Sequence, residues 1–477
     1  MRKSVAIVVV LALAVIGVAI GVITVRNASR DDSSTASEST SDSTSSSTGS
    51  GSKASSSSST KKTSKSTTGS GSSSTTSKVL SDPSEASFDL SAFAIGDWGA
   101  TTYSKNGSCC SRRSDYYYNA FDRHAEQGVS ELMAQTAAVK KPEVVLGHGD
   151  NFYWTGIMGS TDQAYRFEKT FESKYADDAL VEVPWVNVMG NHDYGGGSYV
   201  CSDGTDPAQC SSTSKLLEAL EEKFSLQSTY TSPNNDRWII IDIFNVDTND
   251  AESHGADQIC CQCYGYSEGD DKQCKAATRG HKYCAGGDTD MWDQCMALFK
   301  KWGDEAREKL VEEVGKSTAT WKIVNSHYSP YNHYGETSAD EWAELLKGIS
   351  GSEGGIQLWI NGHTHGEKHD FASFDMHFIE NGAGGGIQSE AASGIPAYAE
   401  SYIESVWVAP GVSDGNTYGF FELSASEEWL KVRFLTFDSN WAITKDDSGY
   451  DKGKIGGVEE GHCWFIPVDG TKGEACS

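Results

Sequence analysis

The stretch EVVLGHGDNFY at residues 143–153 decides the fold, because a short apolar run ends there in Gly149, Asp150, Asn151 and Tyr153. Short apolar runs bounded by glycine and polar residues are typical of buried β-strands. Aspartate and tyrosine directly after such a run place oxygen donors at the carboxyl end of the strand, where open α/β sheets bind ligands. The segment therefore predicts a strand that leads into a binding site.

Four other segments have the same design, an apolar run followed by residues that can bind metal ions. They are SAFAI before GDWG at 96–99, WVNVM before GNHD at 190–193, WKIVNS before His327, and IQLWI before GHTH at 362–365. Helical stretches are expected at 302–314 and at 120–140, the latter with Phe121, Leu132, Met133 and Val139 on its apolar face. The alternation of strands and helices predicts an α/β protein.

The strand ends together carry seven metal-compatible side chains. These are Asp97, Asp150, Tyr153, Asn191, His327, His363 and His365. Each segment alone is also compatible with a turn whose Asp or Asn side chain bonds the local backbone, and His327 alone with an interior histidine. As an ordered set they supply ligands for two adjacent metal ions, and paired ions indicate hydrolysis of a phosphate ester.

The ordered set resembles the purple acid phosphatases, in particular the tartrate-resistant type 5 enzymes, within the calcineurin-like metallophosphoesterase superfamily. The resemblance covers most of residues 86–445 and includes the connecting text YRFEKTFESKY, VPWVNVMGNHDY, ENGAGGG and YGFFELSASEEWLKVRFLTFD. It implies an αββα sandwich of two mixed β-sheets flanked by helices. It also implies an acid phosphatase that hydrolyses phosphate monoesters by attack of a metal-bound hydroxide.

The same resemblance divides the ligands between two metal ions. Asp97, Asp150, Tyr153 and His365 would bind Fe(III), while Asp150, Asn191, His327 and His363 would bind a divalent Fe, Zn or Mn, with Asp150 as the bridge. Donor chemistry agrees, because carboxylates and a phenolate favour a highly charged ion, whereas an amide and imidazoles suit a divalent one. Ordinary metallophosphoesterases have a histidine two residues after the first aspartate. Here that position is Gly99, and Tyr153 fills the gap.

Two histidines outside the ligand set are candidates for catalysis. His192 would orient phosphate and protonate the leaving alkoxide, the alternative being a histidine that only holds its loop. His333 is the nearest match to a second substrate-side histidine of the family, although it follows His327 more closely than expected, and a surface-loop histidine is the alternative. Asp193 and Asn361 are either supports of the ligands or turn residues, and His148 is interpreted as structural.

The N-terminal residues predict the cellular location of the protein. Residues 4–25 are an uninterrupted apolar segment, long enough to cross a bilayer, so residues 1–26 are expected to be a signal anchor or, alternatively, a cleaved signal peptide. Residues 27–84 are rich in Ser and Thr and predict a disordered stalk, leaving 85–477 as the catalytic domain. Asn106 and Asn27 begin glycosylation triplets. We expect a cell-surface or secreted glycoprotein.

Charge narrows the class of substrate. The chain has a net charge of −28; residues 1–81 contribute nine basic and four acidic side chains, a net of +5, so the remainder carries −33. A field of that sign repels large polyanions. It argues against nucleic acid as a partner and favours small phosphomonoesters, with contact to a membrane only through the N-terminal segment.

Twelve cysteines, all after the apolar segment, indicate an oxidising compartment. Six of them crowd an insertion at about 250–296, where disulfides are favoured over a zinc site because the spacing matches no familiar finger. Cys201 with Cys210 and Cys463 with Cys476 are possible local pairs. The insertion is expected near the mouth of the active site, where it would shape substrate entry.

Three functions are compatible with these features. The first is a ferric–divalent acid phosphomonoesterase. The second is a metallophosphoesterase acting on diesters, against which the tyrosine ligand counts. The third is a surface-attached protein with incidental activity, which has no need to keep all seven ligands.

Overall fold

The computed structural model describes most of the chain after residue 80. The described residues are 7–10, 80–99, 122–154, 156–195, 200–201, 209–233, 237–240, 252–253, 255–262, 278–351, 354–410, 418–442 and 455–477. The chain divides into two units, 1–26 with 81–477, and 27–80. The predicted stalk lies outside the described residues apart from 80–84, as do both glycosylation triplets.

Two mixed sheets form the centre of the larger unit. The order in the first sheet is β1 (Ile7–Val10), β6 (Trp321–Asn325), β7 (Leu358–Asn361), β9 (Met376–Asn381), β8 (Glu367–Ala372) and β10 (Ile403–Val408). The order in the second is β14 (Glu474–Ala475), β13 (Val458–Pro467), β12 (Trp429–Phe437), β11 (Gly419–Ala425), β2 (Leu90–Ile95), β3 (Val144–Gly147), β4 (Trp185–Asn187) and β5 (Trp238–Ile240). β1, β6, β7 and β9 are parallel, and so are β2 to β5; the other pairings are antiparallel.

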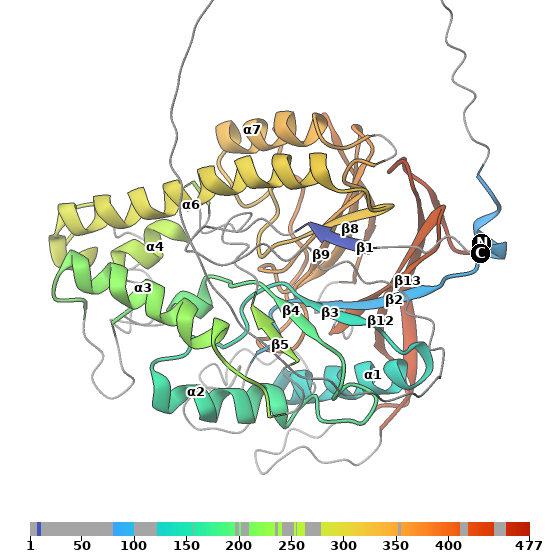
Figure 1. Ribbon diagram of the computed structural model, residues 1–477, viewed down its shortest axis with the longest axis horizontal. Coiled ribbons are helices and arrows are strands. Elements are labelled where there is room, and N and C mark those ends of the chain that lie inside the picture. Colours follow the sequence, from blue (N-terminus) through green and yellow to red (C-terminus); the bar gives the residue numbers. More distant parts are fainter. Residues whose placement is uncertain are drawn as a thin grey trace, which may run out of the picture. The chain divides into compact units, whose positions relative to one another are not determined.

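Helices flank the two sheets (Figure 1). They are α1 (Ala125–Lys140), α2 (Ser160–Arg166), α3 (Thr213–Ser228), α4 (Ala256–Cys261), α6 (Thr289–Lys316) and α7 (Glu336–Lys347). The described residues also form the 3-10 helices η1 (Pro83–Glu85), η3 (Asp122–His124), η5 (His192–Tyr194) and η6 (Ala285–Gly287), and the π-helix η4 (Phe167–Glu172). α6 and α7 run along one side of the sheets, and α1 and α2 along the other. The predicted αββα sandwich is confirmed.

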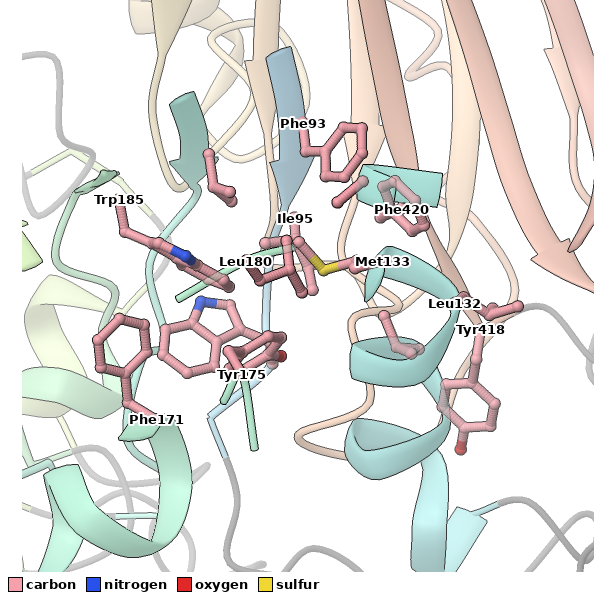
Figure 2. Packing of buried hydrophobic residues seen from close by; sticks show 14 of the residues in the cluster. Phe93, Ile95, Leu132, Met133, Phe171, Tyr175, Leu180, Trp185, Tyr418 and Phe420 are labelled. Carbon is pink, nitrogen blue, oxygen red and sulfur yellow. The ribbon is translucent and has the colours of Figure 1, made fainter. Parts of the chain in front are cut away.

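The core beneath α1 explains its position on the second sheet. Leu132 and Met133 are fully buried in one cluster with Phe93 of β2 and Phe420 of β11 (Figure 2). Val139 was expected on the same apolar face, but it is 77% exposed. Seven residues bring it back to nearly the same direction as Leu132, but it lies in the last turn of α1, after Ala137, the last buried residue of the helix.

The strands that precede the five polar segments are confirmed, with ends within two residues of the predicted runs. They read as continuous apolar runs because parallel strands are covered on both faces. The helix predicted at 302–314 starts earlier, at Thr289. Its buried residues Met291, Cys295 and Phe299 pack in one cluster with Ile259 and Cys260 of the cysteine-rich insertion. Trp342 of α7 packs edge-on against Trp359 of β7, with ring centroids 5.5 Å apart.

Disulfides connect the described cysteines in four pairs. The predicted pairs Cys201–Cys210 and Cys463–Cys476 are confirmed. In the insertion, Cys260 bonds Cys295 and Cys261 bonds Cys284, so these four residues form disulfides and not a zinc site.

The predicted membrane segment is described only at Ile7–Val10. These residues form β1 and pair in parallel with β6. An Ile-Val-Val-Val run suits a strand as well as a membrane, because β-branched side chains favour extended backbone. No helix within the described ranges is long and apolar enough to span a bilayer.

Candidate metal centre

Tight turns at the strand ends bring the five polar segments together. Asp97 after β2, Asp150 after β3 and His363 after β7 have φ angles of 54°, 51° and 71°, in the left-handed region that residues other than glycine seldom adopt. Such residues cluster at functional sites, where the surrounding structure holds them in place. Two of these turns meet directly, because the His363 N–H donates to Asp97 Oδ2 at 2.7 Å.

Two glycines allow the turns to approach the carboxylates. A Cβ atom at Gly190 would lie 2.1 Å from Asp150 Oδ1, and one at Gly362 would lie 2.3 Å from Asp97 Oδ2. Both distances are far inside van der Waals contact. The glycines of GNHD and GHTH are therefore required by the close packing of backbone against the two acidic groups.

Asp97, Tyr153 and His365 form one half of the site. The Tyr153 hydroxyl donates to Asp97 Oδ1 at 2.7 Å and lies 3.3 Å from His365 Nε2, which is 3.7 Å from the same carboxylate oxygen. Asp97 and Tyr153 are fully buried. Three different strand ends thus contribute one carboxylate, one phenol and one imidazole to a single point.

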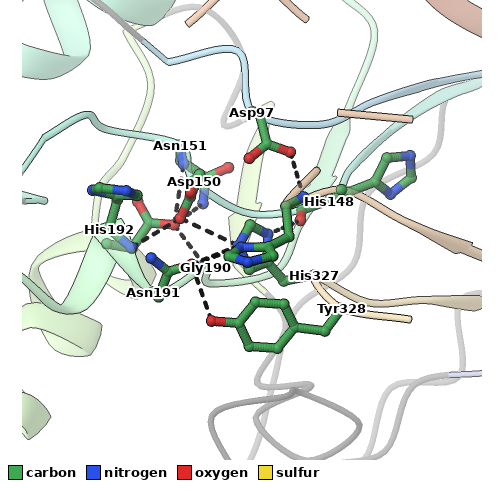
Figure 3. Close-up of polar contacts among 12 residues, drawn as sticks. Asp97, His148, Asp150, Asn151, Gly190, Asn191, His192, His327 and Tyr328 are labelled. Atoms are coloured by element: carbon green, nitrogen blue, oxygen red, sulfur yellow. Dashed lines mark hydrogen bonds and ion pairs between the residues drawn. The ribbon is translucent and has the colours of Figure 1, made fainter. Parts of the chain in front are cut away.

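Asn191, His327 and His363 form the other half. Asn191 Oδ1 lies 2.9 Å from His327 Nε2 and 3.1 Å from His363 Nδ1. Asp150 lies between the halves: its Oδ1 is 3.5 Å from His327 Nε2 (Figure 3). Ligand atoms of Asp97, Asp150 and His327 all lie within 4.8 Å of one another. The structure therefore brings together all seven predicted ligand side chains.

The electrostatics of this cluster call for cations. Burial, and then the charge of Asp150, raise the pKa of Asp97 well above its usual value. Burial and the two carboxylates also raise the pKa of Tyr153. Asp150 Oδ2 is buried with no hydrogen-bond partner among the described residues. Removing two carboxylates from water without compensation costs several kcal/mol per ion, so bound cations suit this donor set.

The orientation of His327 supports the same conclusion. Its Nδ1 lies 2.8 Å from the carbonyl oxygen of His148, which can only accept, so the neutral ring carries its proton on Nδ1. The lone pair of Nε2 then faces Asn191 Oδ1, which is also an acceptor. A cation between these two atoms satisfies both, and the residues present fit a metal ion on this side as well.

Asp193 joins two of the turns. Its carboxylate accepts from the backbone N–H groups of Asn151, Phe152 and Gly190 at 3.0, 3.1 and 2.8 Å, and from Gln227 Nε2 at 3.2 Å. Burial, followed by the charge of Asp150, raises its pKa to about 7. Asp193 therefore fixes the GDNFY turn against the GNHD turn.

The remaining predicted support residues differ from one another. Asn361 donates to its neighbouring carbonyl at Gly362, 3.0 Å away, as a turn residue does. His148 bonds Asn325 Oδ1 through Nδ1, and burial lowers its pKa to about 3. Its carbonyl also orients His327, a backbone role that no side-chain pattern predicts.

His192 lies at the junction of the two halves. Its backbone N–H donates to Asp150 Oδ1 at 2.9 Å, and its Nδ1 lies 2.7 Å from the carbonyl oxygen of Trp154. That carbonyl holds a proton on Nδ1 and directs Nε2 away from the backbone. Its ring lies 4.6 Å from the ring of Tyr153, and burial lowers its pKa.

His333 lies beside the second half of the site, with its ring centroid 4.8 Å from that of His363. Its Nδ1 accepts from the Ser329 N–H at 2.9 Å, so Nε2 carries the proton and lies 3.1 Å from Thr364 Oγ1. The shorter spacing from His327 therefore still brings this histidine to the ligands.

Two residues near the ligands were missed by the sequence analysis. Tyr328 donates to Asn191 Oδ1 at 3.1 Å, and its position directly after His327 was an available signal. Glu390 lies 3.4 Å from His365 Nδ1, and its backbone N–H donates to the His365 carbonyl at 2.7 Å. Nothing near Glu390 in the sequence indicates this contact, because it comes from the loop after β9.

Comparisons with known proteins agree with this geometry. The family model described as calcineurin-like phosphoesterase matches residues 91–367. Purple acid phosphatase 17 of Arabidopsis thaliana is 25% identical over 64% of this chain and 70% of its own length, and purple acid phosphatase 3 of the same plant is 26% identical over 74% and 76%. Tartrate-resistant acid phosphatase type 5 of Homo sapiens is 32% identical over 21% of this chain and 26% of its own length. The resemblance inferred from the sequence is confirmed.

Proposed function

The chain belongs to the calcineurin-like phosphoesterase family, and we propose on that premise that it is a two-metal acid phosphatase that hydrolyses small phosphate monoesters. The observation that carries the proposal is the convergence of seven buried or half-buried donor side chains from five strand ends. The similarity to named acid phosphatases supports the same activity.

The two halves of the site differ in the metal ion they suit. Asp97, Tyr153 and His365, with Asp150, would hold Fe(III), since carboxylate and phenolate oxygens favour a highly charged ion. Asn191, His327 and His363, with Asp150, would hold divalent Fe, Zn or Mn. Bound ions of this kind supply an activated water and neutralise charge on the phosphate, and the trivalent one does so in acid.

His192 and His333 would act on the substrate from opposite sides. The Trp154 carbonyl holds the Nδ1–H of His192, so Nε2 is the nitrogen left to take up a second proton, and the imidazolium form would donate that proton to the leaving alkoxide. His333 presents Nε2–H beside Thr364 and would donate to a phosphate oxygen. No serine or cysteine nucleophile is required.

The surroundings of the enzyme follow from its disulfides and its N-terminal segment. Four disulfides favour an oxidising compartment. We further propose that residues 1–26 direct the chain into the secretory pathway as a signal anchor or signal peptide, and that 27–84 act as a stalk for the catalytic domain at 85–477. The net charge of −33 after residue 81 favours small substrates over polyanions.

The proposal is tested on the full chain produced in an oxidising host. Metal content per chain is measured by elemental analysis, and hydrolysis of one monoester and one diester is followed from pH 4 to 8. We expect two metal ions per chain and a monoester preference with a maximum in acid. A diester preference would assign the chain to the diesterases of the family. A folded, metal-free, inactive protein would instead support the third function, a surface-attached protein.

A further inference from the structure

Tyr328 touches every ligand side chain of the Asn191 half of the site. Its hydroxyl donates to Asn191 Oδ1 at 3.1 Å. Its ring packs edge-on against that of His363, 4.3 Å between centroids, and lies 4.8 Å from that of His327. The side chain is fully buried.

The main chain of Tyr328 is fixed from behind by the first sheet. Its carbonyl oxygen accepts from Ser326 Oγ at 2.8 Å and from the indole Nε1 of Trp359, in β7, at 3.3 Å. The ring can therefore rotate only about its own side-chain bonds. The hydroxyl of Tyr328 is confined by the chain segment that faces it.

That segment is the start of the cysteine-rich insertion. A Cβ atom at Gly255 would lie 2.7 Å from the Tyr328 hydroxyl and 3.6 Å from Asn191 Cβ, so the bare backbone of Gly255 closes the space around the hydroxyl. Ser253 forms an antiparallel bridge with Tyr334, seven residues after His327. Ser253, two residues before Gly255, is thus attached to the loop that carries His327.

Two disulfides and a small core hold the segment in this place. Helix α4 follows Gly255 directly, and its Cys260 and Cys261 are bonded to Cys295 of α6 and to Cys284. Ile259 packs in the same buried cluster as Met189, next to the GNHD turn. The insertion is therefore tied both to the turn of Asn191 and to the helix that leads into β6.

We propose that Tyr328 is a positioning residue for Asn191, and that Gly255 of the disulfide-bonded insertion keeps its hydroxyl on the amide oxygen. A neutral amide is a weak ligand and can turn about its side-chain bonds, so a fixed donor on Oδ1 directs the remaining lone pair toward the ion. Removing a side chain that hydrogen-bonds to a metal ligand typically lowers metal affinity 10- to 100-fold. The inference rests on the proposed two-metal site and assigns the insertion a task in it.

Tyr328→Phe is the direct test, because it keeps the ring and removes only the hydroxyl. The readouts are iron content and zinc affinity, the latter by competition with a chelator on protein that retains its iron. We expect zinc affinity to fall about 10- to 100-fold with unchanged iron content. Tyr230→Phe is the matched control: its hydroxyl donates to Glu172 at 3.1 Å, away from the site, and zinc affinity should not change.

Gly255→Ala tests the role of the insertion in a double-mutant cycle. In the wild-type background the added methyl displaces the hydroxyl and weakens zinc binding by a similar factor. In the Tyr328→Phe background it meets no hydroxyl, and the further loss should be less than threefold. Alanine at a φ of 127° is strained in both backgrounds, which is why zinc affinity and not unfolding temperature is compared.

The possible outcomes separate the positioning role of Tyr328 from the proposed two-metal function. If Tyr328→Phe binds zinc as tightly as the wild type while both hold two metals, the positioning role is refuted and the proposed function stands. If the wild type binds no second ion, the two-metal site fails and this inference with it. Additive losses in the cycle would show that Gly255 does not act through Tyr328.

Discussion

Three hydrogen-bonded histidines, of which His369 and His377 are buried and His462 is half-buried, predict how stability depends on pH. His377 Nε2 lies 3.0 Å from the Thr471 carbonyl, which only accepts; His377 Nδ1 is 2.8 Å from His369 Nε2, and His369 Nδ1 is 3.0 Å from His462 Nε2. One consistent set of neutral tautomers satisfies the whole chain, with each Nε2–H donating to the next acceptor. Burial lowers the pKa values of His377 and His462 to about 4, and that of His369 further.

The sign and size of the effect follow from these pKa values. An unfolded histidine titrates near 6.5, so between pH 6.5 and 4 the unfolded chain binds more protons and the folded state loses stability as the pH falls. For a pKa of about 4 in the folded state, the loss between pH 7 and pH 5 is about 2 kcal/mol per histidine. His377 and His462 together would cost about 4 kcal/mol over this interval.

The perturbation is His462→Phe, which removes one titrating group and keeps a ring stacked on Trp407, 4.6 Å between centroids. At pH 7 the variant should lose about 1 kcal/mol through the missing hydrogen bond. Urea unfolding followed by tryptophan fluorescence at pH 7, 6 and 5 should show a decline about 2 kcal/mol smaller than in the wild type. Carboxyls such as Asp193 are common to both proteins and cancel. An equal loss of stability between pH 7 and pH 5 in both proteins would refute the neutral state of the three hydrogen-bonded histidines.

The remaining predictions concern the site and the stalk. His192→Ala should keep both metals and lose about 10²- to 10⁴-fold in turnover, and less on esters with acidic leaving groups; equal losses on both kinds of ester would mean that it only positions phosphate. Asp193→Asn leaves the backbone N–H groups of Gly190 and Asn151 poorly paired, so the free energy of unfolding in urea should fall by about 1–3 kcal/mol and the metal content should also fall. Unchanged metal content would refute the role of Asp193 in fixing the turns. The full-length protein should sediment with membranes and be released as active enzyme by proteolysis in 27–84; a mature chain starting near Asn27 in the medium would instead show a cleaved signal.

Local patterns predicted the parts of this fold whose causes are local. An apolar run followed by glycine and a donor specifies both the strand and the turn, so the five strand ends and the ligands on them could be located from the sequence. Cys201–Cys210 and Cys463–Cys476 were accessible for the same reason, because each closes a loop of fewer than 15 residues. The prediction that Val139 is buried was wrong because a helical period alone does not show where along the helix the covered part ends.

Contacts between distant segments were beyond such patterns. The hydroxyl of Tyr328 donates to Asn191, which lies 137 positions away in the sequence, and Asp193 accepts from Gln227, which lies 34 positions away. The disulfide from Cys295 of α6 to Cys260 spans 35 positions, and no periodicity indicates it. These contacts depend on which strands are neighbours, and the order of the sheets was not determined by any single stretch of sequence.

The visible absorbance of the purified protein, measured with its iron content, tests the central claim most directly. A phenolate of Tyr153 bound to Fe(III) should make the protein violet or pink through charge transfer. Tyr153→Phe should abolish the band and weaken iron retention without unfolding the protein, while Tyr230→Phe should leave the band intact. A colourless, active protein with two metal ions would contradict the ferric site and assign the chain to the divalent metallophosphoesterases.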